Sequence, residues 1–260
     1  MWWDHSEPLE VYLSDNEVGC RLSSSTPVDW VDTSGSEQAL QHVAAWLDGS
    51  TGLRARRVCV WLSASLAQPF LVPALSGARN KREVAALAKA MTQDATGMDG
   101  EARLWLDRWR PGDSTLAVAI PADIWKRLHD IIEAGNDVRK KTPRQLRPSR
   151  LALVSVRPAW NLPFDTLLAE SRSAPGRMGW SLTDGASILH GVVDQGRVTA
   201  IGFDRHAPHD PAGTLLRRRI QVNWGLVSTS QHLVFERQAG TAETQPFPIG
   251  AWGRLPEGIA

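Results

Sequence analysis

The pattern of hydrophobic and polar residues predicts strands at the start of the chain and then a helix. LEVYL (residues 9–13) and EVGCRLSS (17–24) alternate apolar and polar positions around a Ser-Asp-Asn turn, which predicts an antiparallel hairpin. PVDWVD (27–32) can extend this meander by a third strand. Residues 36–49 follow helical spacing and end at a glycine. The apolar face of this helix would carry Leu40, Val43, Ala44 and Leu47.

The middle of the chain predicts a buried strand, an edge strand and a capped helix. The mostly apolar run 57–63 is typical of a strand covered on both faces. The prolines within 68–75 favour an edge strand, because proline lacks the N–H that a central strand donates. Helical spacing resumes over 80–97, with Asn80 as the N-terminal cap and Gly97 as the end.

A second hairpin and a longer helix follow. Residues 102–109 and 114–120 predict two strands joined by an Arg-Pro-Gly-Asp turn. The segment 121–136 has the clearest helical pattern of the chain, with Pro121 in its first turn and Gly135 as its end. Its apolar face would carry Ile124, Trp125, Leu128, Ile131 and Ile132.

The later sequence predicts mainly strands. Residues 150–156 form another apolar run typical of a buried strand. The stretch 160–179 is expected to be a loop with at most one helical turn. Strands are predicted at 179–183, 186–193 and 197–203, separated by Asp-Gly and Asp-Gln-Gly turns, and Asp-Gly is a strong hairpin signal.

Composition and charge narrow the classes of function. The 260 residues carry 29 basic and 28 acidic side chains, and a formal net charge of +1 provides no overall field that would attract nucleic acid. The hydrophobic content of 42% is sufficient for a buried core. Cys20 and Cys59 are too few for a disulfide framework, so they are expected to be reduced core residues of a cytosolic protein. The sequence shows neither a signal peptide nor a run of apolar residues long enough to span a membrane, so a soluble chain is expected.

The order of these elements resembles the cytoplasmic region of the L component of type II secretion systems and the related PilM-type proteins of type IV pili. The resemblance covers roughly residues 9–205 and lies in the succession of a meander, the strand RVCVWLSAS, the edge strand QPFLVPALSG and a helix rich in small residues. The later WSLTDGASILHGVVDQGRVTAIGF resembles the start of a second half. The positions that carry the first-half pattern are Leu71–Pro73, Lys81–Met91, Trp105–Asp107, Val118–Ile120 and Trp125.

This resemblance implies an α/β fold of the actin-like (ribonuclease H-like) type, with duplicated halves, mixed sheets, flanking helices and an abbreviated second half. A hairpin with an acidic turn opens each half (LSDNEV and LTDGAS), which is weak internal repetition. The expected divisions are 9–150 for the first subdomain, 151–238 for the second and 239–260 for a Gly/Pro-rich tail.

The resemblance also implies a function. It points to a non-catalytic cytoplasmic scaffold, peripheral to the inner membrane, that links a secretion or pilus assembly ATPase to inner-membrane platform proteins. The sequence departs from the family in two ways. The L component continues into a membrane helix that has no counterpart in these 260 residues, and the pilus relative keeps a nucleotide site for which this sequence shows no signal.

The turn at Asp184-Gly185 bears directly on nucleotide binding. An actin-like ATPase bends a loop of several residues around the phosphates, with backbone N–H groups pointing inward. TDGA leaves about two residues between the strands, the length of a type I′ hairpin, and SDNE around Asp15 has the same limit. Neither G-x-x-x-x-G-K-[ST] nor G-x-G-x-x-G occurs. We therefore expect no cofactor and no catalytic residue. The rival hypothesis is an actin-like ATPase or sugar-kinase relative that uses Asp15 or Asp184 with Mg²⁺.

Two other arrangements of chemically active residues are weak. His206, His209 and Asp210 lie close enough in sequence to hold a metal, but two prolines and the lack of a neighbouring Cys or Glu favour a surface loop, so no metal is expected. The G-x-S-x-G motif of a serine nucleophile does not occur.

Candidate contact residues come from a basic segment and from the N-terminus. The polar segment 137–150 is either a solvated connector or a surface that contacts anionic lipid headgroups. Nucleic acid is disfavoured because no aromatic residue is interleaved with its charges. The paired N-terminal tryptophans either dock into a partner or fold back on the core. The residues expected to contact a partner or a membrane are Trp2, Trp3, Arg139, Lys140, Lys141 and Arg144.

A third hypothesis concerns the predicted edge strand. A stand-alone peptide-binding module would add a strand from its ligand to the edge near Gln68–Leu75.

Overall fold

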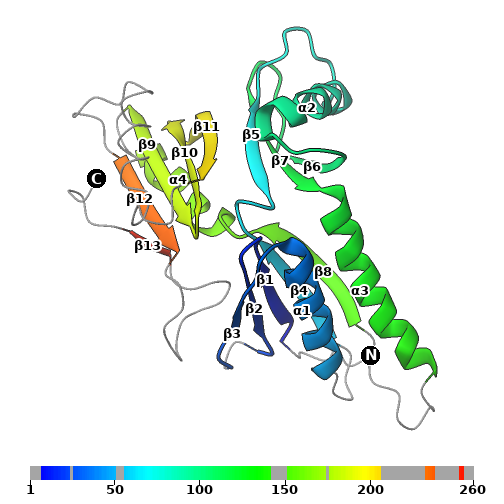
Figure 1. The fold of residues 1–260 in the computed structure, drawn as a ribbon. Helices are drawn as coiled ribbons and strands as arrows, with labels where there is room; N and C mark the ends of the chain where they lie inside the picture. The colour runs from blue at the N-terminus through cyan, green and yellow to red at the C-terminus, as the bar shows by residue number, and fades with distance from the viewer. Residues whose placement is uncertain are drawn as a thin grey trace, which may run out of the picture. The chain divides into compact units, whose positions relative to one another are not determined.

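The computed structural model describes residues 7–23, 26–50, 56–141, 151–173, 176–205, 232–237 and 252–254. The strands and helices are β1 (Leu9–Leu13), β2 (Glu17–Arg21), β3 (Asp29–Asp32), α1 (Ser36–Gly49), β4 (Arg56–Leu62), β5 (Gln68–Val72), α2 (Lys81–Thr96), β6 (Ala102–Leu106), β7 (Thr115–Pro121), α3 (Ala122–Lys141), β8 (Leu151–Pro158), α4 (Asn161–Ser173), β9 (Arg177–Asp184), β10 (Ser187–Asp194), β11 (Arg197–Arg205), β12 (His232–Arg237) and β13 (Trp252–Arg254). They form two compact units (Figure 1). Unit 1 contains β1–β4, α1, α3 and β8, and unit 2 contains β5–β7, α2, α4 and β9–β13.

The two large sheets repeat one topology. In unit 1 the strand order is β3-β2-β1-β4-β8, in which β1, β2 and β3 form an antiparallel meander and β4 runs parallel to β1. In unit 2 the order is β11-β10-β9-β12-β13, again an antiparallel meander followed by a strand, β12, parallel to its first member. This repeat confirms the predicted fold class with duplicated halves. Strand β8 follows the predicted boundary between the subdomains at residue 150, and it pairs with β4 in the first sheet. The exact position of the boundary between the two subdomains remains a prediction.

Helices cover each sheet on the face that buries apolar side chains. In unit 1, α1 packs against β1 and β2, α3 packs against β8, and the two helices contact each other. In unit 2, α4 packs against β9 and β10, while α2 covers the small sheet β5-β7-β6. The core beneath α2 joins Phe70, Val84, Ala88, Ala117 and Ala119.

Glycines opposite large rings fix the register of both meanders. Gly19 on β2 pairs with Trp30 on β3, and a Cβ at Gly19 would lie 2.6 Å from the indole. Gly191 on β10 pairs in the same way with Trp180 on β9, where a Cβ would lie 2.8 Å from the indole. Because only glycine leaves room for the ring to lie across the neighbouring strand, each pair locks the alignment of its hairpin.

Helix α2 follows its sequence signals closely. The Asn80 side chain accepts hydrogen bonds from the backbone N–H groups of Arg82 and Glu83, as expected of an N-terminal cap. Gly97 adopts a left-handed conformation with φ of 65°, and its N–H donates to the carbonyl of Gln93. Both predicted ends are therefore confirmed.

Helix α3 is longer than its sequence predicts. It runs through Gly135 to Lys141, so Arg139, Lys140 and Lys141 belong to a helix, whereas we expected a connector. Gly135 does not end the helix, since it lacks the positive φ of a C-terminal cap. A Cβ at this position would lie 3.4 Å from the side chain of Leu151. The next residue, Asn136, donates from Nδ2 to the Leu151 carbonyl (3.0 Å) and accepts from its N–H (2.9 Å). The glycine thus serves close packing against β8.

The segment 160–179 corrects a second prediction, because most of it is the helix α4. Proline at position 163 occupies the first turn, where a backbone N–H has no partner within the helix and its loss costs nothing. The buried side chains Phe164, Leu167 and Ser171 follow helical spacing. The helical spacing of these buried residues is a sequence signal that the expectation of a loop did not take into account.

The cysteines are free, as expected. Cys20 is buried and Cys59 is partly buried. Burial, with a smaller effect from the charge of Asp29, raises the pKa of Cys20 to about 12, so its thiol stays protonated at neutral pH. Within the described residues, none of the helices combines the length and the hydropathy that a bilayer crossing requires.

Candidate functional site

The first acidic hairpin holds its carboxylate in a serine network. Strands β1 and β2 pair in a register that leaves Asp15 and Asn16 as the two turn residues, and the Ser14 N–H donates to the Glu17 carbonyl at 3.0 Å. Asp15 accepts a hydrogen bond from the Ser65 hydroxyl at 2.8 Å, and the Ser65 hydroxyl lies 2.7 Å from that of Ser63. The carboxylate therefore ties the hairpin to the segment that follows β4.

The second acidic hairpin buries its carboxylate. Asp184 pairs with Ser187, so Gly185 and Ala186 form a two-residue turn, and Asp184 is 4% exposed. Of the two turn residues, only Gly185 has a positive φ, at 59°. That pattern belongs to a type II′ turn and corrects the type I′ turn we expected, although the predicted length is confirmed.

Both hairpins bear on the rival nucleotide hypothesis. A two-residue turn keeps its amides close to the strand ladder, so neither hairpin has the loop length that wraps phosphates. Among the described residues, no three His, Cys, Asp or Glu side chains gather as a metal would require. The predicted metal candidates His206, His209 and Asp210 lie outside the described residues.

The structure describes three of the six predicted contact residues. Trp2, Trp3 and Arg144 lie outside the described residues. Arg139, Lys140 and Lys141 form the end of α3. The predicted edge strand is β5, at the end of the sheet β5-β7-β6, and β11 from the larger sheet of unit 2 lies near it without pairing with it.

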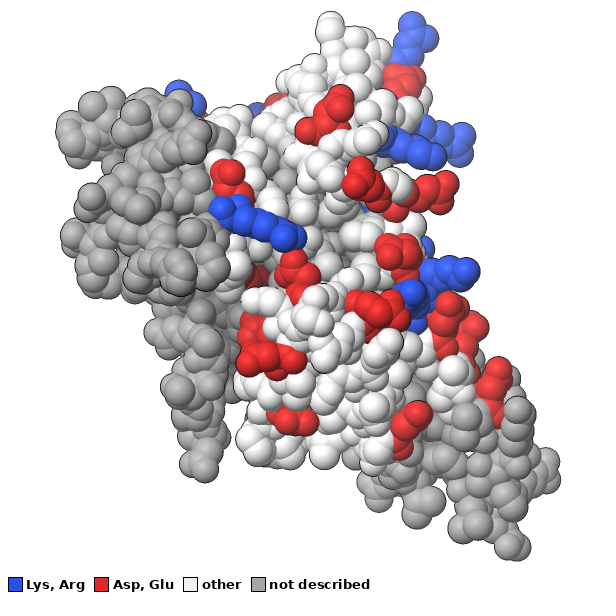
Figure 2. All heavy atoms as spheres, in the orientation of Figure 1, with Lys and Arg blue, Asp and Glu red and all other residues white. Residues whose placement is uncertain are grey.

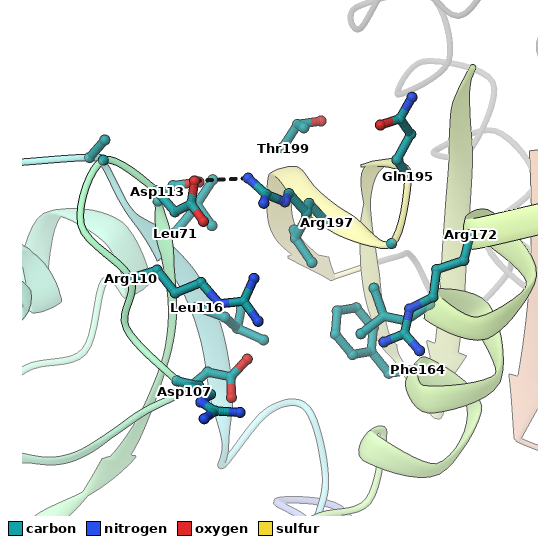
Figure 3. Close-up of a pocket in the computed structure, with 17 residues that line it drawn as sticks. Leu71, Asp107, Arg110, Asp113, Leu116, Phe164, Arg172, Gln195, Arg197 and Thr199 are labelled. Atoms are coloured by element: carbon teal, nitrogen blue, oxygen red, sulfur yellow. Dashed lines mark hydrogen bonds and ion pairs between the residues drawn. The ribbon is translucent and has the colours of Figure 1, made fainter. Parts of the chain in front are cut away.

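Sequence reasoning missed a groove in unit 2 with a volume of about 820 Å³, which we call the basic groove (Figure 3). It lies between the β6–β7 loop on one side and α4 with the β10–β11 turn on the other. Its apolar lining consists of Leu71, Ala74, Leu116, Phe164, Leu168 and Val198. Its charged lining consists of Asp107, Arg108, Arg110, Asp113, Arg172 and Arg197.

The charges of the basic groove are unbalanced. Arg197 donates to Asp113 Oδ1 at 2.8 Å, an exposed pair that adds little stability. Arg108, Arg110 and Arg172 are exposed, and within the described part of the chain none of them forms an ion pair. Four arginines against two aspartates give the lining a local excess of positive charge. On the face that Figure 2 shows, acidic side chains are numerous.

The wall formed by the β10–β11 turn is held against α4. Gln195 and Gly196 both have positive φ, 49° and 76°, which defines a type I′ turn. The Gly196 N–H donates to the Ser171 hydroxyl at 3.0 Å, and a Cβ on Gly196 would lie 2.5 Å from Arg172 Cγ. The turn therefore packs on the stem of Arg172. Gln195 is the only non-glycine residue with positive φ in the described residues, and such strain often marks a functional surface.

Strand β10 also carries a buried histidine, which pairs with Gly202 of β11. His190 Nε2 lies 2.8 Å from Asp204 Oδ2, and its ring packs over Gly202. Burial lowers the pKa of His190 below its usual 6.5, and the hydrogen bond and charge of Asp204 act in the opposite direction. The neutral imidazole is thus favoured, which fits a structural link between β10 and β11.

Comparison with known proteins identifies the fold. No protein-family profile matches the chain, and no curated protein matches it. A protein of Bacteroides thetaiotaomicron with an actin-like ATPase fold is 9% identical over 91% of this chain and 83% of its own, with a TM-score of 0.56. The PilM-PilN complex of type IV pilus biogenesis matches at 11% identity over 90% and 81%, with a TM-score of 0.54. The cytoplasmic domain of EpsL from the type II secretion system of Vibrio cholerae matches at 16% identity over 95% and 90%, with a TM-score of 0.47.

At these identities the likeness to the first two structures concerns the fold alone. Together with the repeated sheet topology, it establishes that the chain has an actin-like fold. The resemblance predicted from sequence is thereby confirmed at the level of architecture.

Proposed function

We propose that the chain is a non-catalytic cytoplasmic scaffold of a type II secretion or type IV pilus assembly platform. It binds at the periphery of the inner membrane and links the assembly ATPase to inner-membrane platform proteins. The observation that carries the proposal is the length of the acidic hairpins: on an actin-like fold, both reverse over two residues. The carboxylate of Asp15 accepts a hydrogen bond from Ser65 and that of Asp184 is buried, so both are engaged within the fold.

The class of partner is supported by the likeness to PilM. That protein is found in a complex with PilN, and the complex belongs to type IV pilus biogenesis. This chain covers 81% of the matched structure, enough for a similar framework to present partner-binding surfaces. A scaffold needs packed surfaces and no bond chemistry, which fits the lack of nucleotide motifs in the sequence.

The proposed contact residues are Trp2, Trp3, Arg139, Lys140, Lys141 and Arg144. Paired tryptophans provide the large apolar area typical of an interface anchor. The basic residues at the end of α3 would approach anionic lipid headgroups, each contributing about 1 kcal/mol near the surface.

Binding to purified partners tests the proposal. The chain should bind the assembly ATPase from the same organism with a micromolar or lower dissociation constant, measured by biolayer interferometry. Replacing Trp2 and Trp3 by alanine should weaken binding at least tenfold, because the interface would lose the apolar area of two indoles. A tenfold loss of affinity corresponds to about 1.4 kcal/mol of binding free energy. Replacing the exposed Leu162 on α4 by alanine is the control and should leave binding unchanged. The scaffold proposal would be abandoned if neither the ATPase nor the inner-membrane platform proteins bound the unaltered chain.

A further inference from the structure

We propose that the basic groove of unit 2 binds an extended acidic segment of a partner protein. The groove combines arginines that have no carboxylate partner among the described residues with an apolar floor, and it is built from elements far apart in the sequence. The identification of the occupant as a protein rests on the proposed scaffold function.

Charge is the first reason for an acidic occupant. Four arginines and two aspartates line the groove, and one aspartate, Asp113, already pairs with Arg197. Arg108, Arg110 and Arg172 are left to bind anions. Guanidinium groups bind carboxylates through two parallel hydrogen bonds, so each of them can select a Glu or Asp side chain.

The placement of the arginines favours an extended chain over a single small anion. Arg110 projects from the β6–β7 loop and Arg172 from α4, on opposite walls of the groove (Figure 3). Leu116 and Phe164 lie between them. One phosphate would leave most of the roughly 820 Å³ unfilled, whereas a segment with alternating acidic and apolar residues would place carboxylates at the walls and apolar side chains on the floor.

The floor and one wall are held rigidly before any ligand arrives. Phe164 is buried and makes edge-to-face contacts with Trp160 and Trp180, with ring centroids 5.5 and 5.3 Å apart. The stem of Arg172 is pinned by Gly196, whose own N–H is fixed by Ser171. A site whose side chains are already placed loses less conformational entropy on binding.

Fluorescence anisotropy with a labelled nine-residue peptide of alternating glutamate and leucine tests the inference. The peptide should bind the full chain, and the matching peptide with glutamine in place of glutamate should bind at least tenfold more weakly. The double variant Arg110→Gln, Arg172→Gln should also lose at least tenfold. Glutamine at position 172 keeps the Cγ that packs on Gly196, and a thermal melt confirms folding. Arg82→Gln, on the exposed face of α2, is the matched control and should bind like the unaltered chain.

Three results would overturn the inference. They are failure of the glutamate peptide to bind, equal binding by the Arg110 and Arg172 variant, and displacement of the peptide by millimolar inorganic phosphate at the ionic strength of the control. If the peptide test fails but the assembly ATPase still binds the chain, only the inference about the basic groove is wrong and the scaffold function stands. If the ATPase and the platform proteins also fail to bind, the scaffold function fails independently.

Discussion

Replacing Gly191 by alanine should lower the free energy of unfolding of unit 2 by about 3 kcal/mol, the upper range for overpacking a tight site. The added Cβ would lie 2.2 Å from the carbonyl oxygen of Ala200 on β11 and 2.8 Å from the Trp180 indole on β9. The first contact is with backbone, so relief requires β10 and β11 to separate. The loss is measured by urea denaturation followed by circular dichroism.

Gly49→Ala is the matched control for this prediction. Gly49 ends α1, and a Cβ there meets no atom within 4 Å. Alanine restricts the unfolded chain and suits a helix, so stability should stay the same or rise by up to about 1 kcal/mol. Equal losses of stability in the two variants would contradict the prediction, because the contact of the added Cβ with β11 would then not be the cause of the loss.

Replacing Trp160 by alanine should cost about 4 kcal/mol, in the range for deleting a buried aromatic side chain. Trp160 is fully buried, packs edge-to-face on Phe164, and donates from Nε1 to the Ala67 carbonyl at 2.8 Å. Ala67 precedes β5 and Trp160 precedes α4, so this indole joins the two sides of the basic groove. The same variant should therefore weaken binding of the acidic peptide.

Two further substitutions separate the causes of this loss. Trp160→Phe keeps most of the aromatic packing but leaves the Ala67 carbonyl without its donor, and it should cost about 1–3 kcal/mol. Leu162→Ala changes an exposed side chain of the same helix and should cost less than about 0.5 kcal/mol. A Trp160→Ala variant no less stable than Leu162→Ala would contradict the central packing role of the indole.

Local signals in the sequence predicted the reversals and helix ends that depend on backbone conformation. The ends of α2 at Asn80 and Gly97 lie where their residues indicate, and the turn at Gly196 lies within the predicted Asp-Gln-Gly segment. The reversal near Gly185 has the predicted length of two residues, but it consists of Gly185 and Ala186, and Asp184 belongs to β9. These signals work because Asn caps and left-handed glycines satisfy backbone groups within a few residues. The same reasoning failed at Gly135, because contact with Leu151, distant in sequence, decides its role.

The basic groove could not be predicted from sequence. Strand β7, helix α3 and strand β8 lie between Arg110 and Arg172 in the sequence, and each of the two by itself is an ordinary exposed arginine. Periodicity reports which face of an element is buried but not which loops of different elements converge. The Asp-Gln-Gly turn on one wall was predicted, but the positive φ of Gln195 is visible only in the structure.

Calorimetric titration with Mg·ATP tests most directly the central claim that both acidic hairpins are too short to hold a nucleotide. The account predicts no heat of binding and an unchanged melting temperature at millimolar Mg·ATP. A nucleotide present at 100 times its dissociation constant would stabilise the chain by about 2.7 kcal/mol, which is readily measured. Saturable binding that is lost in Asp15→Asn or Asp184→Asn would contradict the account, because one of these two carboxylates would then serve the metal after all.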